Sequence, residues 1–448
     1  MAEIVPFRGT RYAASRGRAL GLLLAPPYDL VSIEQRDELL RRSPDNVVHV
    51  TVGEDRPGDG PLSNKYTRAA EHWARWRQQG ILRRDPAPSF YPLEQSFWAP
   101  DGRHVRRRGF MAAVRLHAFG EGVIVPHEKT LAAPKADRLE LLKAVKANLS
   151  PLLGLYRDEA RATARAFDEF TAGHEPAAEV DTDDGVHHRL WRVDAPEAVA
   201  AFRALTASER IIIADGHHRY ETCLEYERLL DAAEPTLPRD GGHHYALFFL
   251  CPMSDPGLIL FPTHRLLFGL KDFSLPAFLE ALSRFFTVET LPEDLHRASG
   301  RAWAISRLAE HGGKSIAFLM VTHEDQKARI LTLRDDADLE AAELPRNDTL
   351  RALDVTVLHG AVLQHLLGLS PSAVTNQENV TYVRDAGEAV NRVLSGEHPV
   401  GFLLNPTPMW QVQAIGDAGE TMPQKSTYFY PRLQSGLVMR EVDPREAP

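Results

Sequence analysis

The sequence predicts an α/β (α+β) fold, in which a mixed-sheet core with insertions is followed by a smaller C-terminal α+β region. Three observations predict it. The chain has 448 residues, 44% hydrophobic and 25% charged, which is enough for two or three packed domains. Up to about residue 270, apolar runs of strand length alternate with segments of helical periodicity. Beyond residue 270 two helices precede two strands, which is typical of a separate α+β unit.

The first hundred residues are expected to contain two strands and two helices. Apolar runs predict strands at residues 20–25 and 46–52. Ser32 and Gln35 have the spacing of a capping box, so a helix is expected over residues 33–42. A second helix is expected over residues 65–79. Trp73 and Trp76 would lie on its buried stripe, and Gly80 would end it.

A hairpin and a loop-helix segment follow. Residues 91–98 and 104–116 read as two strands around the turn signal Pro100-Asp101-Gly102. A charge-rich loop then precedes a helix, which is expected to begin near Asp137, since Asp137 and Glu140 have capping-box spacing, and to be stopped by Pro151.

The next elements form an α/β unit. After a polar stretch at residues 173–186, read as a loop, the pattern predicts a helix, a strand, a second helix and two strands. These cover residues 196–205, 210–214, 217–232, 245–251 and 258–264.

The remainder reads as a small α+β domain and a tail, which divides the chain into residues 1–270, 271–343 and 344–448. Helices are expected at 275–286, 301–310 and 355–368, and strands at 315–322, 328–333, 400–406 and 410–416. We expect the tail to complete the functional site.

Charge and cysteine content exclude several classes of protein. The 52 Lys and Arg residues and 61 Asp and Glu residues give a net charge of −9, which argues against a general nucleic-acid binder. Only two cysteines occur, Cys223 and Cys251, so the chain has no disulfide framework and no Cys-rich zinc site. With no signal peptide or membrane span in the sequence, a cytoplasmic protein is expected.

The densest group of reactive side chains is Asp215-Gly216-His217-His218-Arg219, at the end of an apolar strand and before a helix. Backbone N–H groups at a helix N-terminus attract phosphate or carboxylate, and Arg219 would add a charge-assisted hydrogen bond. The alternative is an ordinary surface turn. The position at a strand end, where α/β folds place ligands, favours an anion site.

Two further clusters suit phosphoryl transfer, which requires cations around the phosphate and a carboxylate. The first combines a carboxylate, cations and a helix start in residues Glu128, Lys129, Thr130, Lys135, Asp137, Arg138 and Asn148, with His127 beside them. The second is Lys425-Ser426 in the tail. A solvated surface and a plain loop are the respective alternatives.

Several other patterns are interpreted as structural. Residues 312–315 (GGKS) lack the first P-loop glycine and precede a strand, so a turn is expected. The histidine pairs 187–188 and 243–244 lack HExxH spacing and are expected to face solvent. The run Arg106–Arg108 is expected on an exposed strand.

Four blocks of sequence resemble a known family in order along the chain. APPYDLVS, VPHEKTLAAPKADRLELLKAVKANLSPLLGLY, ADGHHRYET and MPQKSTYFYPRLQSGLV are similar to the bacterial and archaeal family called domain of unknown function ten-fifteen. That name implies no chemistry.

The DGHHR string also resembles the phosphate-binding loop of the ParB/sulfiredoxin superfamily, and the free-serine kinases of that superfamily carry the same string. The resemblance implies a ParB/sulfiredoxin-like nucleotide-binding core in residues 1–270, binding ATP or ADP with Mg²⁺. His217 replaces the sulfiredoxin cysteine, which argues against sulfinic-acid repair. No basic helix-turn-helix follows, which argues against a DNA-binding ParB-type protein. The catalytic carboxylate of the kinases would correspond to Asp29 or Glu34.

The sequence thus favours a small-molecule kinase, for which roles can be assigned. Asp215, His217 and His218 would be catalytic, with Asp215 also a metal ligand. Phosphate binding would involve Gly216, Arg219, Glu128, Lys129, Lys135 and Arg138, and substrate binding Asp29, Lys425 and Ser426. Expected partners are a nucleotide and a small hydroxyl compound, and not a membrane; a homodimer is left open. The alternative is a non-catalytic, ParB-like nucleotide sensor.

Overall fold

The computed structural model describes residues 1–99, 101–129 and 133–448, which form two compact units. The first comprises the described residues of Met1–Pro126, Thr130–Ile259 and Phe429–Pro448. The second comprises His127–Lys129 and Leu260–Tyr428. The chain therefore leaves the first unit and returns to it for its last twenty residues.

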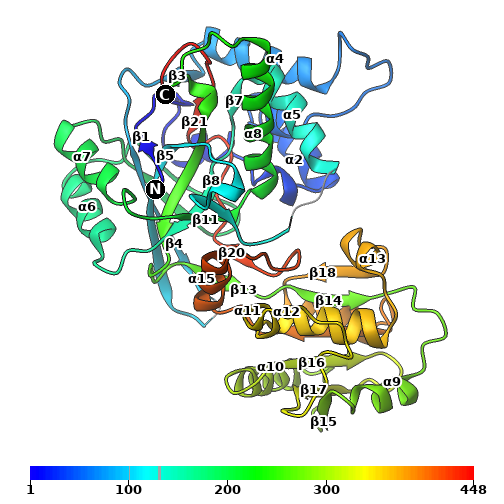
Figure 1. The fold of residues 1–448 in the computed structure, drawn as a ribbon. Coiled ribbons are helices and arrows are strands. Elements are labelled where there is room, and N and C mark those ends of the chain that lie inside the picture. Colours follow the sequence, from blue (N-terminus) through cyan, green and yellow to red (C-terminus); the bar gives the residue numbers. More distant parts are fainter. Residues whose placement is uncertain (100, 130–132) are drawn as a thin grey trace. The chain divides into compact units, whose positions relative to one another are not determined.

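The first unit contains a nine-stranded mixed sheet, counted over the described residues, in the order β6-β11-β8-β12-β5-β4-β10-β9, with β1 paired to β5 (Figure 1). Its strands are β1 (Ile4–Val5), β4 (Tyr91–Trp98), β5 (His104–Arg115), β6 (Ile124–Pro126), β8 (Leu152–Tyr156), β9 (Ala178–Asp181), β10 (His187–Leu190), β11 (Ile211–Asp215) and β12 (Tyr245–Pro252). β11 is parallel to β6 and antiparallel to β8, while β8 is parallel to β12. The mixed sheet predicted from the sequence is confirmed.

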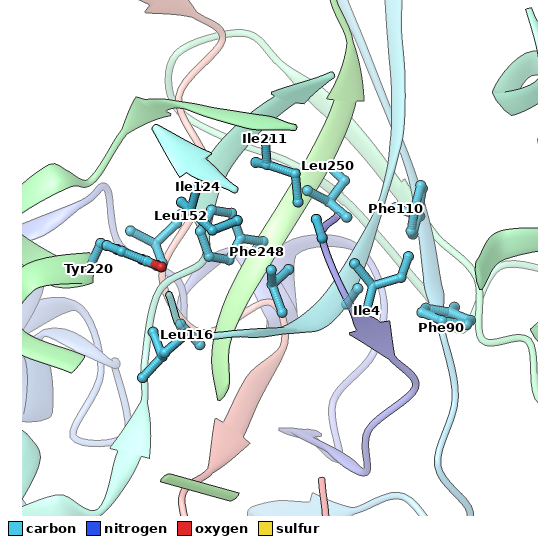
Figure 2. Close-up of a cluster of buried hydrophobic side chains, with 14 of the residues drawn as sticks. Ile4, Phe90, Phe110, Leu116, Ile124, Leu152, Ile211, Tyr220, Phe248 and Leu250 are labelled. Atoms are coloured by element: carbon cyan, nitrogen blue, oxygen red, sulfur yellow. The ribbon is translucent and has the colours of Figure 1, made fainter. Parts of the chain in front are cut away.

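The core of this unit lies on the central strands. Ile211, Phe248 and Leu250 are completely buried and lie near one another in Figure 2. β12 is buried along its whole length, which explains why YALFFLC shows no polar alternation. This core fixes the end of β11, where the DGHHR loop begins.

A four-stranded sheet in the order β3-β2-β21-β7 incorporates the end of the chain into the first unit. Its strands are β2 (Gly9–Tyr12), β3 (Leu82–Arg84), β7 (Ala147–Asn148) and β21 (Met439–Glu441). The buried Arg440 of β21 donates hydrogen bonds to the carbonyls of Gly242 and Tyr245. The last segment is therefore an integral part of this unit.

The helices of the first unit begin and end largely at recognisable signals. Ser32 accepts a hydrogen bond from Gln35 N at the start of α2, as predicted, and Asn64 caps α4. The helices are α1 (Gly17–Gly21), η1 (Tyr28–Leu30), α2 (Ile33–Arg42), α3 (Val48–Thr51), α4 (Lys65–Gln78), η2 (Phe119–Glu121), α5 (Ala133–Val145), α6 (Ala162–Thr171), α7 (Pro196–Ala204), α8 (His217–Ala233) and η3 (Gly242–His244).

The second unit contains an antiparallel six-stranded sheet in the order β15-β17-β16-β19-β14-β18. Its strands are β14 (His264–Leu267), β15 (Phe286–Thr290), β16 (Ala317–Thr322), β17 (Ala328–Leu333), β18 (Val380–Val383) and β19 (Val400–Leu404). β13 (Ile259–Phe261) and β20 (Tyr428–Tyr430) form a separate two-stranded sheet. The six-stranded sheet joins strands from both sides of residue 343. The boundaries of the two compact units therefore differ from the domain boundaries expected at residues 270 and 343.

The helices of the second unit are α9 (Leu275–Leu282), α10 (Ala298–Gly312), α11 (Asp348–Arg351), α12 (Asp354–Val357), the π-helix η4 (Leu358–Leu366), α13 (Pro371–Thr375), α14 (Ala386–Leu394) and α15 (Met409–Ala418). No helix within the described residues has the length and apolar character required to span a bilayer.

Five local predictions are wrong. Residues 20–25 contain the end of α1, residues 46–52 contain α3, and residues 410–416 lie in α15, where strands were expected. β9 lies within the presumed loop at 173–186. α5 begins at Ala133 and ends at Val145, so Asp137 lies inside the helix and Pro151 does not stop it.

The two most informative errors have physical causes. Asn46 donates to the carbonyls of Leu22 and Leu24, and its Oδ1 accepts from Val48 N, so a tertiary contact caps a helix on a strand-like sequence. In α15, Val412, Ile415 and Gly416 are buried at helical spacing, which the alternating Gln residues concealed.

Candidate anion-binding site

The DGHHR loop has the predicted strand-turn-helix structure. β11 ends at Asp215, Gly216 has φ +91°, and α8 begins at His217. A Cβ at Gly216 would lie 2.7 Å from Leu152 Cδ2 and 2.9 Å from Arg219 Nη2. Both the left-handed backbone and the close contact with Arg219 therefore require glycine here.

Two arginines hold the carboxylate of Asp215. Arg219 Nη2 donates to Oδ2 at 2.9 Å, and Arg432 Nη1 donates to Oδ1. Burial alone raises the pKa of Asp215, but the charges of Arg432 and Arg219 outweigh it and lower the pKa to about 2. Asp215 is thus a permanently charged anchor for both guanidinium groups.

The sequence analysis missed Arg432. This arginine follows Pro431 in the tail block, where no spacing or periodicity connects it with a residue more than two hundred positions earlier. Only the return of the tail to the first unit brings Arg432 to Asp215.

Arg219 and Arg138 line one pocket of about 70 Å³ in the first unit. The other lining residues are Tyr28, Thr51, Leu141, Leu142, Ala147, Asn148, Leu149, Ser150, Leu152, Thr222, Cys223 and Leu247. A space of this size holds about five water molecules. It suits a phosphate or carboxylate group and does not enclose a whole nucleotide.

Both guanidinium groups are oriented by the protein. Arg219 Nη1 donates to the carbonyl of Pro151 at 2.6 Å. Arg138 donates to Asp137 Oδ2 and to the carbonyl of Thr51, each at 2.8 Å, and lies 4.2 Å from the centre of the Tyr28 ring. Two oriented guanidinium groups beside one small pocket have the geometry and charge that anion binding requires.

The other predicted residues of the first unit lie around this loop and on η1. His217 is buried and His218 half-buried, at the start of α8. Lys135 forms an ion pair with Glu221 at 2.7 Å. Asp29 is exposed on η1, next to Tyr28, whose ring lines the pocket.

Glu34, the second candidate carboxylate, has a local partner. Its side chain accepts a hydrogen bond from Ser32 Oγ at 2.8 Å, and hydrogen bonds from the helix start and Ser32 lower its pKa. The side chain of Glu34 is therefore engaged in a hydrogen bond within the N-terminal turn of α2.

Four predicted residues belong to the second unit, and none of them lines the pocket described above. Glu128 Oε1 accepts hydrogen bonds from both N and Oγ1 of Thr427, each at 2.8 Å. Lys129 has an exposed side chain, and its backbone N–H donates to the carbonyl of Met422. Thr130, the next residue of this predicted cluster, lies outside the described residues.

Lys425 and Ser426 lie in a tight turn of the same unit. Lys425 is exposed and has φ +57°. Ser426 is buried, and its hydroxyl donates to the carbonyl of Pro423 at 2.5 Å. The main-chain carbonyl of Lys425 accepts a hydrogen bond from Arg265.

Arg265 is a second residue that the sequence analysis missed. Its side chain is buried, and burial lowers its pKa to about 10. It lines a cavity of about 310 Å³ together with Asp354, Asn405 and Trp410. The sequence around Arg265 (PTHRLL) reads as an ordinary strand start and gave no signal of a buried charge.

Three expectations of exposure are wrong, while one turn is confirmed. Arg107 is completely buried and donates to Gln95 Oε1 and to the carbonyl of Pro431. His188 and His243 are each about 1% exposed. Gly312 and Gly313 end α10 before β16, as expected of a turn.

The family model described as "Protein of unknown function (DUF1015)" matches residues 4–356, more than half of the chain. The chain belongs to this family. The family expected from the sequence is therefore confirmed, and the first three of the four sequence blocks lie within the matched residues.

Eight chains of solved structures match. A free serine kinase in complex with AMP is 13% identical, with 73% of this chain and 90% of that chain covered and a TM-score of 0.37. A conserved hypothetical protein from Pyrococcus furiosus is 13% identical (73% and 94% covered, TM-score 0.36). SbnI from Staphylococcus aureus, truncated at its C-terminus, is 13% identical (72% and 84%, TM-score 0.33). No curated protein matches the chain.

Proposed function

We propose that the pocket beside the DGHHR loop binds a phosphate group of ATP or ADP and that the protein transfers a phosphoryl group to a small hydroxyl compound. The observation that carries this proposal is that two oriented arginines, Arg138 and Arg219, line one phosphate-sized pocket at the start of α8. The DGHHR string shared with the free-serine kinases supports the nucleotide. The base and sugar would extend outside the enclosed space.

The proposed roles follow from the contacts. Arg138 and Arg219 bind the phosphate oxygens, and the hydroxyl of Ser150, which also lines the pocket, supplies a neutral hydrogen bond. Asp215 positions Arg219. A role as general base would conflict with its pKa of about 2.

The remaining predicted roles stay part of the proposal. Asp29, exposed beside the pocket residue Tyr28, is the proposed catalytic carboxylate. His217 and His218 are proposed to contact the transferred phosphoryl group, and Lys135 to add positive charge. Glu128, Lys129, Lys425 and Ser426 belong to the second unit, and no role at this pocket is proposed for them.

The pocket does not fit Mg²⁺ by itself. None of the described residues that line it carries a carboxylate, and both oxygens of Asp215 accept hydrogen bonds from arginines. Mg²⁺ prefers carboxylate, phosphate and water oxygens. We therefore assign no step to a metal ion at this pocket.

Nucleotide binding and turnover test the proposal. Thermal unfolding is measured with ATP, ADP, CTP and GTP, each with and without Mg²⁺; a ligand at 100 times its Kd adds about 2.7 kcal/mol of stability. Turnover is then measured with a panel of amino acids and other small alcohols. Arg219→Ala and Arg138→Ala are each expected to weaken nucleotide binding about 10- to 100-fold, the loss of one charge-assisted hydrogen bond.

Arg228→Ala is the matched control, since Arg228 lies on the same helix but its side chain is 64% exposed and paired with Glu225. Its nucleotide affinity is expected to equal that of the wild type. If no nucleotide stabilises the protein, or if all three variants bind equally, the proposal is wrong.

The absence of a carboxylate among the described lining residues favours a second candidate, a nucleotide sensor without catalytic activity. Three results together would identify the sensor. Nucleotide binding would depend on Arg138 and Arg219, no acceptor would give turnover, and the nucleotide would shift the protein between monomer and dimer.

A further inference from the structure

A second cluster of functional side chains lies in the first unit, away from the anion pocket. α8 carries Glu227 and Asp231 one turn apart, and η3 carries His243 and His244. Single ligand atoms of Asp231, His243 and His244 all lie within 4.8 Å of one another. Twelve residues of helix, about 18 Å, separate Asp231 from Arg219.

Two of the distances between these ligand atoms lie close to the spacing around a tetrahedral zinc ion. His243 Nε2 lies 3.0 Å and His244 Nε2 3.9 Å from Asp231 Oδ1. With Zn–N and Zn–O bonds of 2.0–2.2 Å, neighbouring ligand atoms in a tetrahedron lie about 3.4 Å apart. The two measured distances fall on either side of this value, so small side-chain movements suffice.

The orientation of His244 also fits a ligand. Its Nδ1 lies 2.6 Å from Glu227 Oε1, a contact in which Nδ1–H donates to the carboxylate. This contact leaves the lone pair of Nε2 directed toward Asp231. A carboxylate that fixes the outer nitrogen of a histidine in this way is the usual support of a zinc-bound imidazole.

Burial and the helix end add two independent arguments. The side chain of His243 is 0% exposed and that of His244 14%, whereas Asp231 is 48% exposed and leaves one side open for water. Asp231 lies in the last turn of α8, where the helix dipole disfavours a carboxylate and favours a cation. A bound cation would neutralise the charge of Asp231 and would interact favourably with the negative end of the helix dipole.

We propose that Asp231, His243 and His244 bind a zinc ion, with water as the fourth ligand and Glu227 positioning His244. The site would link the end of α8 to the start of β12. This proposal is independent of the proposed nucleotide pocket.

The test is direct metal binding by the full-length, tag-free protein after treatment with EDTA. Zn²⁺ is titrated against a chromogenic chelator, and X-ray absorption reports the ligands. One equivalent per chain, with two imidazole nitrogens and carboxylate oxygen around it, is expected. His244→Ala and Asp231→Asn are each expected to weaken binding at least 100-fold, and Glu227→Gln 10- to 100-fold.

His187→Ala is the matched control, because His187 contacts Glu179 and Asp181 on a half-exposed strand but lies outside the cluster. It is expected to retain the full equivalent. Circular dichroism of the metal-free variants shows whether each one folds. Asp231→Asn is expected to fold, because the side chain of Asp231 is half-exposed. Failure of the wild type to bind one equivalent would overturn the proposal. Wild-type zinc affinity in the folded Asp231→Asn and His244→Ala variants would also overturn it.

Discussion

The carboxylate of Asp215 connects two parts of the chain through Arg219 and Arg432, and its side chain is 15% exposed. Replacing it by asparagine leaves two partly buried guanidinium groups without their anion. Such a loss costs about 3–5 kcal/mol. Asp215→Asn is therefore expected to lower the free energy of unfolding strongly at pH 7, as measured by urea denaturation.

The pH dependence of this effect follows from the lowered pKa of Asp215, about 2. The stabilisation is fully present above the unfolded pKa of about 3.9 and is lost as the pH falls through 2. The difference between wild type and Asp215→Asn is thus expected to shrink below pH 4. Asp168→Asn is the control, since Asp168 also pairs with an arginine but is 67% exposed, and it is expected to cost less than about 1 kcal/mol.

Asp354, which lines the cavity of the second unit, has a raised pKa, so its effect on the pH dependence of stability is opposite to that of Asp215. Burial raises its pKa to about 7. Between pH 4 and 7 the unfolded chain releases a proton that the folded chain retains, so this group lowers stability as the pH rises. Asp354→Asn is expected to match the wild type near pH 4 and to exceed it by up to about 4 kcal/mol at pH 8, measured by denaturant midpoints. Equal midpoints at pH 8 would contradict this expectation.

At this scale the sequence indicates which residue types occur at a site but not their partners. Asp215 and Arg219 were predicted because they are close in sequence, after an apolar strand. Arg432 and Arg265 could not be predicted, since only tertiary contacts bury them. Charge patterns distinguish neither a buried arginine from a solvated one nor His243 from a surface histidine.

The turn between β11 and α8 depends on Gly216. Alanine there would adopt a positive φ and would also collide with Leu152 and Arg219. We expect Gly216→Ala to cost about 1–2 kcal/mol for the backbone and a further 1–3 kcal/mol for the overlap.

Gly185→Ala separates the two contributions. Gly185 has φ +76°, but nothing lies within 4 Å of its added Cβ, so only the backbone cost is expected. Thermal unfolding of both variants provides the measurement. Equal losses of stability would show that the contact with Leu152 and Arg219 is unimportant.

Elements with strong local signals could be predicted from the sequence. α4 has a capped start and two buried tryptophans on one stripe, and the β4–β5 hairpin has strand-forming residues on both sides of Asp101-Gly102. The short helix α3 could not be predicted, because its start depends on a hydrogen bond to the side chain of Asn46, which lies outside the helix.

At the scale of the whole molecule, the first unit is discontinuous in sequence: residues 429–448 return to it after the chain has formed the second unit. A chain that ends at Tyr428 would lose β21, Arg440 and the buried apolar residues Phe429, Leu433, Leu437, Val438, Met439 and Val442. At roughly 1.5–3 kcal/mol for each apolar side chain, the loss equals the usual net stability of a protein.

We therefore expect this truncation to unfold the first unit and to spare the second, whose six-stranded sheet is complete by Leu404. Hydrogen exchange would show loss of protection in β5 and β12 and its retention in β16 and β19. A chain ending at Glu446 is the control and is expected to behave as the full chain. Continued protection of β5 and β12 after removal of residues 429–448 would contradict this expectation.

The sequence predicted the mixed α/β class because strand and helix periodicities are local. It did not predict that the tail returns to the first unit, since the pairing of β21 with β2 and β7 joins segments hundreds of residues apart. Contacts of that sequence separation leave no periodicity in either segment.

The return of the tail has a consequence for biosynthesis. A ribosome makes Asp215 and Arg219 more than two hundred residues before it makes Arg432. The nascent chain therefore carries an incomplete charge cluster until the segment with Arg432 has been made, and proteolytic removal of that segment would break the cluster again. The charge cluster around Asp215 is thus complete only after the segment that carries Arg432 has folded back onto the first unit.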